Sequence, residues 1–384
     1  MARSDKSVLG LWWRNTDRWT FAAFMALIAA GVFLVSAASP SVAERIGLAP
    51  FHFVKRHIVF LFPALGALLA MSLASRQTLW RVSTLVFSGS LFLCILAIFM
   101  GPEIKGATRW VHMFGVSLQP SEFLKPSLAI VSAWLMARHH DRENFPGYQL
   151  SITAFLIAAG VLLVQPDFGM TFVLACIWGA QLFMAGLPLL LVFVLGGLVV
   201  AGIIGAYIML PHVASRIDRF LDPAAGDNYQ VQKSLDAFGN GGLFGTGPAH
   251  GQVKLKLPDA HADFIFAVIG EELGLIATLL LVSVFCFIIV RSFMRIRHSD
   301  DLFVVLATGG LLTQLALQSL IHMGSSLQLL PAKGMTLPFI SYGGSSLIAT
   351  GFSAGLLLAL TRRRAGTAPD PSWSPVFRGK KAHA

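Results

Sequence analysis

Residues 263–290 read DFIFAVIGEELGLIATLLLVSVFCFIIV, and this stretch decides the fold class. After Glu272 it continues for eighteen residues without a charged side chain. A helix needs about 20 predominantly apolar residues to cross the hydrocarbon core of a bilayer. The stretch is therefore predicted to be a transmembrane helix that begins at a group of acidic residues.

Nine further stretches pass the same test, which predicts an all-α, polytopic integral membrane protein with about ten transmembrane helices. The 384 residues are 55% hydrophobic and 12% charged, whereas proteins on average contain about 25% charged residues. This composition, with a mean hydropathy of +0.70, excludes a pair of soluble domains. The nine stretches are residues 19–39, 54–74, 79–100, 120–138, 150–165, 169–186, 188–210, 302–324 and 343–361.

The distribution of basic residues predicts the orientation, because cytoplasmic loops of membrane proteins carry an excess of Lys and Arg. With the N-terminus inside, the inner tails and loops hold 17 of the 29 Lys and Arg residues and 7 of the 19 Asp and Glu residues. The entire net charge of +10 then lies on the inner face. The charge therefore indicates topology and argues against a nucleic-acid partner, and both termini are predicted to be cytoplasmic.

The predicted organisation is a cytoplasmic tail over residues 1–18, a membrane domain over 19–361 and a second cytoplasmic tail over 362–384. A large extracytoplasmic loop, at about 211–262, joins the seventh and eighth predicted helices. Cys94, Cys176 and Cys286 lie in apolar stretches far apart in sequence. This placement is typical of core residues and not of a disulfide framework or a metal site.

Glu122 and Lys125 lie at the start of the fourth predicted helix, where ionisable side chains are costly and by default indicate function. At a spacing of three residues they share a helix face and can neutralise each other. They either line a functional cavity or form a structural ion pair that holds two helices together, and the sequence favours neither. Ser121 is the predicted N-cap residue of this helix.

Asp263 stands where the outer loop meets the eighth predicted helix, close to Asp259, His261, Glu271 and Glu272. Acidic groups gathered at a membrane surface retain protons more strongly, which suits a general base. Capping of the helix N-terminus is the structural alternative for Asp263, and the crowding of acids favours the functional interpretation. His261 could be a base or a metal ligand, but an ordinary loop histidine is favoured over both.

The outer loop also contains the glycine-rich segment AFGNGGLFGTG at residues 237–247. Glycines let backbone N–H groups approach a phosphate, although a flexible turn is the simpler interpretation. The sequence lacks a Walker A motif, so ATP hydrolysis is not expected. Most outer cations are expected to anchor the protein at lipid headgroups, and some could contact a phosphate. They are Arg109, Arg216, Arg219, Lys254, Lys256 and Lys333.

These features suit a lipid-linked, phosphate-bearing substrate that is either modified or transported at the outer leaflet. Four segments, taken in order, make the sequence similar to the SEDS (shape, elongation, division, sporulation) family, the FtsW/RodA group. They are QPSEF at 119–123, QPD at 165–167, the glycine-rich loop followed by HADFIFA at 261–267, and PFISYGG at 338–344. The resemblance spans residues 19–361, and AKGMTLP at 332–338 is most similar to the division member of the family.

This resemblance implies a peptidoglycan glycosyltransferase that polymerises lipid II on the outer face of the membrane during septal cell-wall synthesis. It implies a class B penicillin-binding protein, which is a transpeptidase, as partner, together with other divisome membrane proteins. The expected location is the bacterial cytoplasmic (inner) membrane at the division septum. A cofactor is not evident; Mg²⁺ or Mn²⁺ could neutralise the leaving diphosphate, although the sequence shows no metal ligand set.

In the resemblance, the family's essential loop aspartate corresponds to Asp263, and its Glu and Lys lining a central cavity correspond to Glu122 and Lys125. We hypothesise that Asp263 accepts the proton of the GlcNAc 4-hydroxyl of one lipid II molecule. That oxygen then attacks the anomeric carbon of the donor MurNAc and displaces undecaprenyl diphosphate with inversion. The cations expected to offset the diphosphate charge are Lys333 and Arg216 or Arg219. The other substrate-binding candidates are Arg109, Asp167, His261 and Ser341.

Two alternatives belong to other functional classes. A lipid II flippase would use Glu122 and Lys125 along a path across the bilayer and would not need Asp263. A non-catalytic divisome scaffold would activate the penicillin-binding protein through contact surfaces alone. The loop carboxylates favour the enzyme over both.

Overall fold

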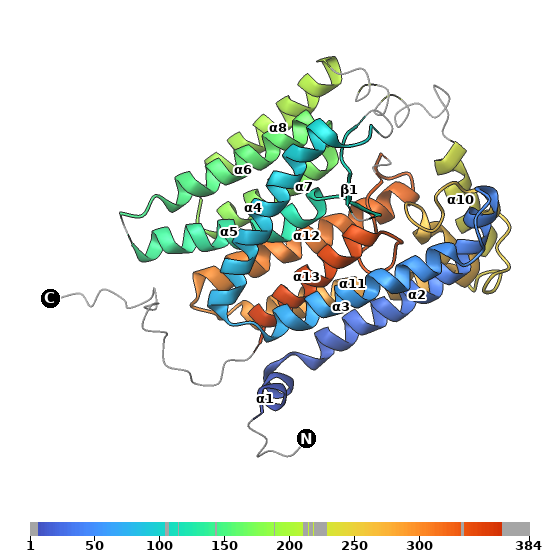
Figure 1. Cartoon of the computed structure of the whole chain (residues 1–384), viewed down its shortest axis with the longest axis horizontal. Coiled ribbons are helices and arrows are strands. Elements are labelled where there is room, and N and C mark those ends of the chain that lie inside the picture. The colour runs from blue at the N-terminus through green and yellow to red at the C-terminus, as the bar shows by residue number, and fades with distance from the viewer. Residues whose placement is uncertain are drawn as a thin grey trace.

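The computed structural model describes residues 7–103, 107–113, 115–142, 144–187, 189–209, 214, 218, 229–331 and 334–362. Each of the ten stretches that the sequence predicts to be helical contains a helix, and these helices form one bundle (Figure 1). They are α2 (Arg18–Arg45), α3 (His52–Leu73), α4 (Arg76–Met100), α5 (Ser121–Asp141), α6 (Gly147–Val164), α7 (Phe168–Met184), α8 (Leu189–Met209), α11 (Ile265–Ile296), α12 (Leu302–Ser326) and α13 (Gly344–Leu360).

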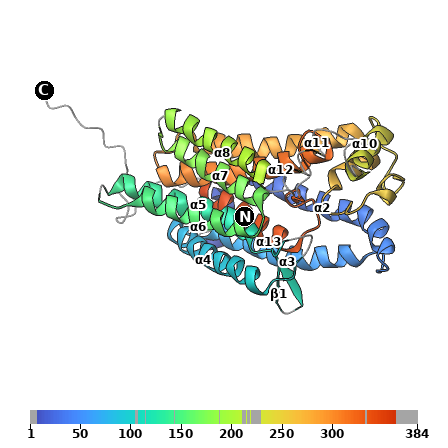
Figure 2. The ribbon, with the colours of Figure 1, turned by 90° about the horizontal axis from the view of Figure 1, so that it is seen from above.

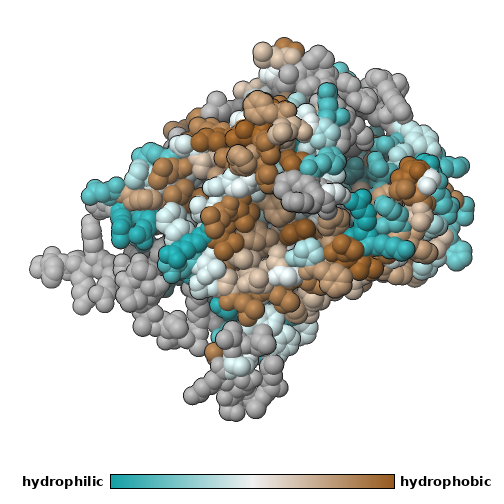
Figure 3. Space-filling model, viewed as in Figure 1, coloured by the Kyte–Doolittle hydropathy of each residue, from teal (hydrophilic) through white to brown (hydrophobic). Residues whose placement is uncertain are grey.

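Six of these helices are long and apolar enough to cross a membrane by length and composition. They are α2, α3, α4, α6, α11 and α12, while α7 and α13 are shorter apolar helices. The visible face is hydrophobic across its middle, with hydrophilic residues gathered toward its ends (Figure 3). Such a band is expected where helices face lipid, so the protein is a polytopic membrane protein. The exact number of spans remains a prediction.

The remaining described elements are short and lie outside the ten helices. They are α1 (Val8–Asn15), β1 (Val111–Met113), β2 (Val116–Leu118), α10 (Tyr229–Gly241) and the 3₁₀ turn η1 (Lys254–Lys256). The strands β1 and β2 form an antiparallel hairpin in which Val111 faces Leu118. In both ribbon views α10 lies at one end of the bundle, beyond α11 (Figures 1 and 2).

The prediction of Ser121 as the N-cap of α5 is wrong by one residue. Pro120 occupies the N-cap position with a φ of −67°, and Ser121 is the first helical residue. The ring of proline fixes φ in the helical range and its missing N–H is not needed at a helix start, so the helix can begin directly after it. Buried Ser121 instead accepts a hydrogen bond from the side-chain amide of Gln119, at 3.3 Å.

The centre of the bundle is formed by α12 and α5, which are buried along most of their lengths. Beside them, α13 packs closely on α3 through two glycines. A Cβ atom at Gly351 would lie 2.3 Å from the carbonyl oxygen of Ala64, and one at Gly355 would lie 2.5 Å from that of Leu68. Small residues permit this close backbone approach, which is the usual basis of helix packing in membranes.

The glycine-rich segment predicted as a phosphate loop or flexible turn instead packs against a kink in α11. Gly274 interrupts the helical geometry of α11 with a φ of 77°. A Cβ atom at Gly241 would lie 1.9 Å from the carbonyl oxygen of Gly270, and one at Gly245 would lie 2.1 Å from that of Glu272. The amides of Thr246 and Gly247 donate to α11 carbonyls at 2.9 and 3.0 Å. These two amides are therefore used by the fold itself.

Glu271 and Glu272 anchor the outer loop, which differs from their predicted role in an acid–base cluster. Glu271 accepts hydrogen bonds from the amides of Val253 and Lys254, at 2.7 and 2.9 Å, and from the side chain of Asn240, at 2.9 Å. Glu272 pairs with buried Lys254, which also donates to a backbone carbonyl of α2 at 3.0 Å. Lys254, predicted as an outer cation, is therefore committed to this structural contact.

Replacing Gly241 with Ala is expected to destabilise the protein by about 1–3 kcal/mol, because the new methyl group overlaps the α11 backbone. Gly239→Ala is the matched control, since a Cβ there has no atom within 4 Å and alanine favours the helix. Thermal unfolding in detergent should show a lower melting temperature for Gly241→Ala and an equal or higher one for Gly239→Ala. Equal behaviour of the two variants would contradict the packing of α10 on α11.

Candidate active site

Asp263 lies in the turn that leads into α11, and its side chain is partly exposed. The amides of Ala262 and Asp263 both donate to the carbonyl of Asp259, at 2.9 and 3.0 Å, so the turn is closed by its own backbone. The N-cap position of α11 is Phe264, and the helix begins at Ile265. Asp263 therefore lies one residue before the cap position.

The segment after residue 333 lies directly against Asp263. A Cβ atom at Gly334 would lie 3.4 Å from Asp263 Oδ2, which places the carboxylate against this backbone. Buried Ser341 accepts a hydrogen bond from the amide of Leu337 and donates to the carbonyl of Ala262, each at 2.8 Å. Ser341 thus fixes the residue immediately before Asp263.

His261 is buried and packs on aromatic rings. Its ring centroid lies 4.0 Å from that of Phe53 and 5.1 Å from that of Tyr342. Its carbonyl accepts a hydrogen bond from the amide of Tyr342 at 2.9 Å. Burial lowers the pKa of His261 to about 4, so its side chain is neutral at pH 7. These contacts favour a packing role that orders the loop on the N-terminal side of Asp263.

Lowering the pH from 7 to 5 is expected to destabilise the wild-type chain more than a His261→Phe variant. An unfolded histidine takes up a proton near pH 6.5, whereas folded His261, whose pKa is lowered by burial, does so only near pH 4. Between these values stability falls by up to about 1.4 kcal/mol per pH unit as the pH decreases. Melting temperatures across this range test the difference, and parallel curves for both proteins would contradict it.

Glu122 and Lys125 form a buried ion pair that continues as a hydrogen-bonded network. Lys125 Nζ lies 2.9 Å from Glu122 Oε2 and donates to Gln318 Oε1 of α12 at 3.1 Å. Gln318 Nε2 then donates to the carbonyl of Thr336 at 3.1 Å. Because Thr336 is two residues from Gly334, this network connects α5 and α12 to the backbone that faces Asp263.

Arg109 and Asp167 lie together at the break between α6 and α7. Arg109 donates to the carbonyls of Pro166 and Gln165, at 2.5 and 3.4 Å, and its Nε lies 3.8 Å from Asp167 Oδ2. Asp167 is the N-cap residue of α7 and accepts from the amide of Met170 at 3.4 Å. Burial raises the pKa of Asp167, and the charge of Arg109 opposes that increase. The Arg109–Asp167 pair fixes the chain between α6 and α7, and the Arg109 guanidinium lies beside this break.

Of the remaining predicted cations, Lys256 is exposed at the end of η1, whereas Lys333, Arg216 and Arg219 lie outside the described residues. Within the described ranges, the structure shows no group of three His, Cys, Asp or Glu side chains that could hold a metal ion. The described part of the site therefore consists of Asp263, the Gly334–Ser341 backbone and the network behind it. It presents a carboxylate at the outer end of the bundle that can accept a proton.

Sequence reasoning did not identify Gln318 or Thr336. The available signal was the spacing of Gln314, Gln318 and His322, which places three polar side chains on one face of the apolar helix α12. His322 bonds the carbonyl of Met335 at 2.6 Å, so this face holds the same segment at two neighbouring points. Polar residues inside a membrane helix indicate a partner or a function even when they carry no charge.

A family model described as cell cycle protein, covering FtsW, RodA and SpoVE, matches residues 17–366. Relatives carrying the name "Probable peptidoglycan glycosyltransferase FtsW" include the protein of Caulobacter vibrioides, which is 40% identical over 95% of this chain and 94% of its own. The protein of Coxiella burnetii, with the same name, is 37% identical over 90% of this chain and 95% of its own.

Solved structures are similar over nearly the whole length. One, described as "Structural coordination of polymerization and crosslinking by a peptidoglycan synthase complex", has a TM-score of 0.73 and 26% identity, and covers 90% of this chain and 97% of its own. The rod shape determining protein RodA of Thermus thermophilus has a TM-score of 0.66 and 26% identity, with 91% and 97% covered.

Proposed function

This chain belongs to the FtsW/RodA/SpoVE family of cell cycle proteins, and on that premise we propose that it is a peptidoglycan glycosyltransferase of bacterial cell division. The observation that carries the proposal is the 40% identity over 95% of the chain to a relative with that name. The substrate is lipid II, in which undecaprenyl diphosphate carries the disaccharide peptide. The reaction takes place on the outer face of the cytoplasmic membrane.

Asp263 acts as the general base of this reaction. Its carboxylate accepts the proton of the GlcNAc 4-hydroxyl of the acceptor as that oxygen forms a bond to the anomeric carbon of the donor MurNAc. The bond between this carbon and the diphosphate oxygen breaks, and undecaprenyl diphosphate leaves with both bonding electrons. The partly exposed position of Asp263 at the end of the bundle supports this role, since a large acceptor sugar must reach it.

Several other residues position this base and the two substrates. Ser341 and His261 hold the turn around Asp263, and the Glu122–Lys125 pair supports the Gly334 backbone through Gln318. Arg109 contributes a cation at the break between α6 and α7. Lys333, with Arg216 or Arg219, offsets the charge of the leaving diphosphate. A divalent cation, Mg²⁺ or Mn²⁺, bound to that diphosphate would share this role.

The partner that we propose is a class B penicillin-binding protein, which cross-links the new glycan at the division septum together with other divisome membrane proteins. A similar structure is that of a complex that coordinates polymerisation with cross-linking, which supports a stable assembly of the two activities. The protein thus acts as the polymerising half of a septal synthase in the inner membrane.

The proposal is tested against transport and scaffolding with purified protein in vesicles that contain labelled lipid II. We expect glycan polymer without faster movement of lipid II between leaflets. A flippase would accelerate leaflet transfer without forming polymer, and a scaffold would do neither. Moenomycin in every sample excludes polymer made by a contaminating bifunctional synthase.

A further inference from the structure

Phe339 has a backbone conformation that phenylalanine rarely adopts. Its φ of 63° lies in the left-handed region, where the Cβ atom of an L-residue crowds its own backbone. The residue is buried in a turn at residues 337–341, whose last two amides donate to the carbonyl of Leu337, each at 3.0 Å. Backbone strain of this kind persists only where surrounding contacts impose it, and it gathers at functional sites. The contacts around Phe339 therefore bear on what this turn does.

Two residues on one face of α2 receive Phe339. The ring of Phe339 lies 5.7 Å from that of buried Phe24, measured between centroids. Its carbonyl oxygen points at Gly31, where a Cβ atom would lie 2.0 Å from that oxygen and 3.1 Å from the Cα atom of Ile340. Phe24 and Gly31 are seven residues apart, close to two helical turns, and so share this face. Glycine at position 31 is what allows the 337–341 turn to lie this close to α2.

The 337–341 turn is bonded to the turn that carries Asp263. Ser341 donates to the carbonyl of Ala262 at 2.8 Å, and the amide of the residue after Ser341 donates to the carbonyl of His261 at 2.9 Å. Both bonds hold residues that directly precede Asp263. A movement of the 337–341 turn away from α2 is therefore transmitted to the backbone of Asp263.

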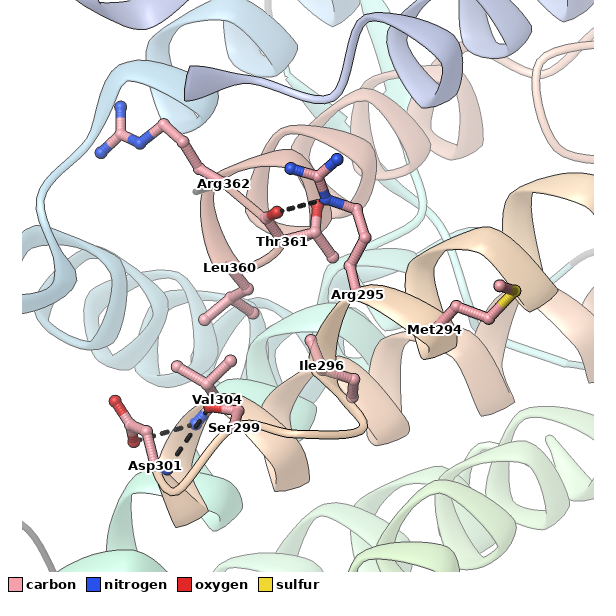
Figure 4. Close-up of a pocket in the computed structure, with 9 residues that line it drawn as sticks. All are labelled: Met294, Arg295, Ile296, Ser299, Asp301, Val304, Leu360, Thr361 and Arg362. Atoms are coloured by element: carbon pink, nitrogen blue, oxygen red, sulfur yellow. Dashed lines mark hydrogen bonds between the residues drawn. The ribbon is translucent and has the colours of Figure 1, made fainter. Parts of the chain in front are cut away.

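Contacts near both ends of α2 prevent this helix from moving aside. Near the outer end, the carbonyl of Ala37 accepts a hydrogen bond from the outer loop at 3.0 Å. At the inner end, the N-cap residue Asp17 is bound by Arg291 of α11 at 2.6 and 2.8 Å and lies 3.3 Å from Arg295. Arg295 also donates to the carbonyl of Thr361, at the end of α13, at 2.9 Å (Figure 4). An overlap at the middle of α2 must therefore be relieved by the 337–341 turn.

We propose that Gly31 is a positioning residue for glycosyl transfer, which acts through Phe339 on Asp263. The inference rests on the proposed function and extends it to α2, which contributes no other residue to the candidate active site. Phe24 and Gly31 hold Phe339 in its left-handed conformation. The 337–341 turn then holds the Asp263 carboxylate where the acceptor hydroxyl can reach it. A methyl group at position 31 would move the Phe339 carbonyl by about 1 Å or more before the two reach an ordinary contact distance.

The test compares Gly31→Ala with Gly355→Ala in the purified full chain. A Cβ atom at Gly355 would also overlap a backbone carbonyl, that of Leu68 at 2.5 Å, but eleven residues beyond the start of α13 and on its contact with α3. Both variants should therefore unfold at a lower temperature than the wild type. Only Gly31→Ala should lower kcat for polymer formation, by roughly 10²-fold, while the KM for lipid II stays close to the wild-type value.

Hydrogen exchange measures the displacement of the turn without any substrate. The amides of Ala262 and Asp263 close their turn by donating to the carbonyl of Asp259. Gly31→Ala should speed the exchange of these amides, and Gly355→Ala should leave it as in the wild type. This measurement holds even if the wild-type chain forms no polymer, so it separates failure of this inference from failure of the proposed function.

A second variant keeps the proposal testable if Gly31→Ala does not fold. Phe24→Leu retains an apolar core residue but removes the ring that packs on Phe339, so it should lower kcat by a smaller factor and speed exchange of the same amides. Wild-type exchange in folded Gly31→Ala, or in Phe24→Leu where Gly31→Ala does not fold, would overturn the proposal. Where the wild type forms polymer, an unchanged kcat in that variant, or equal kcat losses in Gly31→Ala and Gly355→Ala, would overturn it as well.

Discussion

Replacing Asp263 with Asn is expected to reduce the rate of glycan formation by a factor of roughly 10²–10⁴. The amide has nearly the same shape as the carboxylate but cannot accept a proton from the acceptor hydroxyl. Because Asp263 is partly exposed and precedes the N-cap of α11, its replacement should leave the fold intact. Polymer formation from labelled lipid II measures the rate, and unfolding in detergent verifies the fold.

The matched control for this variant is Asp259→Asn. Asp259 belongs to the same turn and has a φ of 51°, a conformation that asparagine accepts readily. The control should retain activity within about threefold, because the backbone carbonyl of Asp259, which the substitution keeps, accepts the two amide hydrogen bonds that close the turn. Substantial activity in Asp263→Asn would remove Asp263 from the role of general base. Equal losses in both variants would assign the effect to the turn as a whole.

Replacing Lys125 with Met is expected to destabilise the protein by about 3–5 kcal/mol, because Glu122 is left buried without its ion-pair partner. The loss should appear as a much lower melting temperature and a reduced yield of folded protein. The double variant Glu122→Gln with Lys125→Met should recover most of the stability, since it buries no charge.

The double variant also distinguishes a structural pair from one that supports the active site. Without Lys125, Gln318 loses one of its partners, and the backbone near Gly334 loses part of its support. A displacement of about 1 Å at a reacting group can lower a rate about 10²-fold, so activity should remain low although stability returns. Recovery of both stability and activity would show that the pair only stabilises the bundle.

The ten helices could be predicted because apolar length is a local property of the sequence. Residues 302–324, for example, are mostly apolar and contain no Asp, Glu, Lys or Arg, and α12 covers Leu302–Ser326. The orientation of the helices could be predicted from the charges of the loops, because loop charge is also a local property of the sequence. The N-cap of α5 was misplaced because Pro120 and Ser121 both suit a helix start, and local preference does not separate them.

The roles of the outer acids could not be predicted, because they depend on contacts between distant segments. Glu271 and Glu272 stand near Asp263 in sequence, yet their partners come from residues 240–254. The glycines of the preceding segment allow close backbone packing on α11. From its composition alone, the same segment resembles a phosphate-binding loop. Gln318 could not be identified from the sequence, because a neutral amide in an apolar helix is a weaker signal than a charged side chain. Its hydrogen bonds to Lys125 and Thr336 make it central to the site.

The central claim is that this chain itself polymerises lipid II through Asp263. It is tested most directly by glycan formation from lipid II with the purified chain and its penicillin-binding protein as the only added proteins, in the presence of moenomycin. We predict polymer with the wild-type chain and formation slower by roughly 10²-fold or more with Asp263→Asn. The absence of polymer from a folded wild-type chain that binds lipid II would contradict the claim.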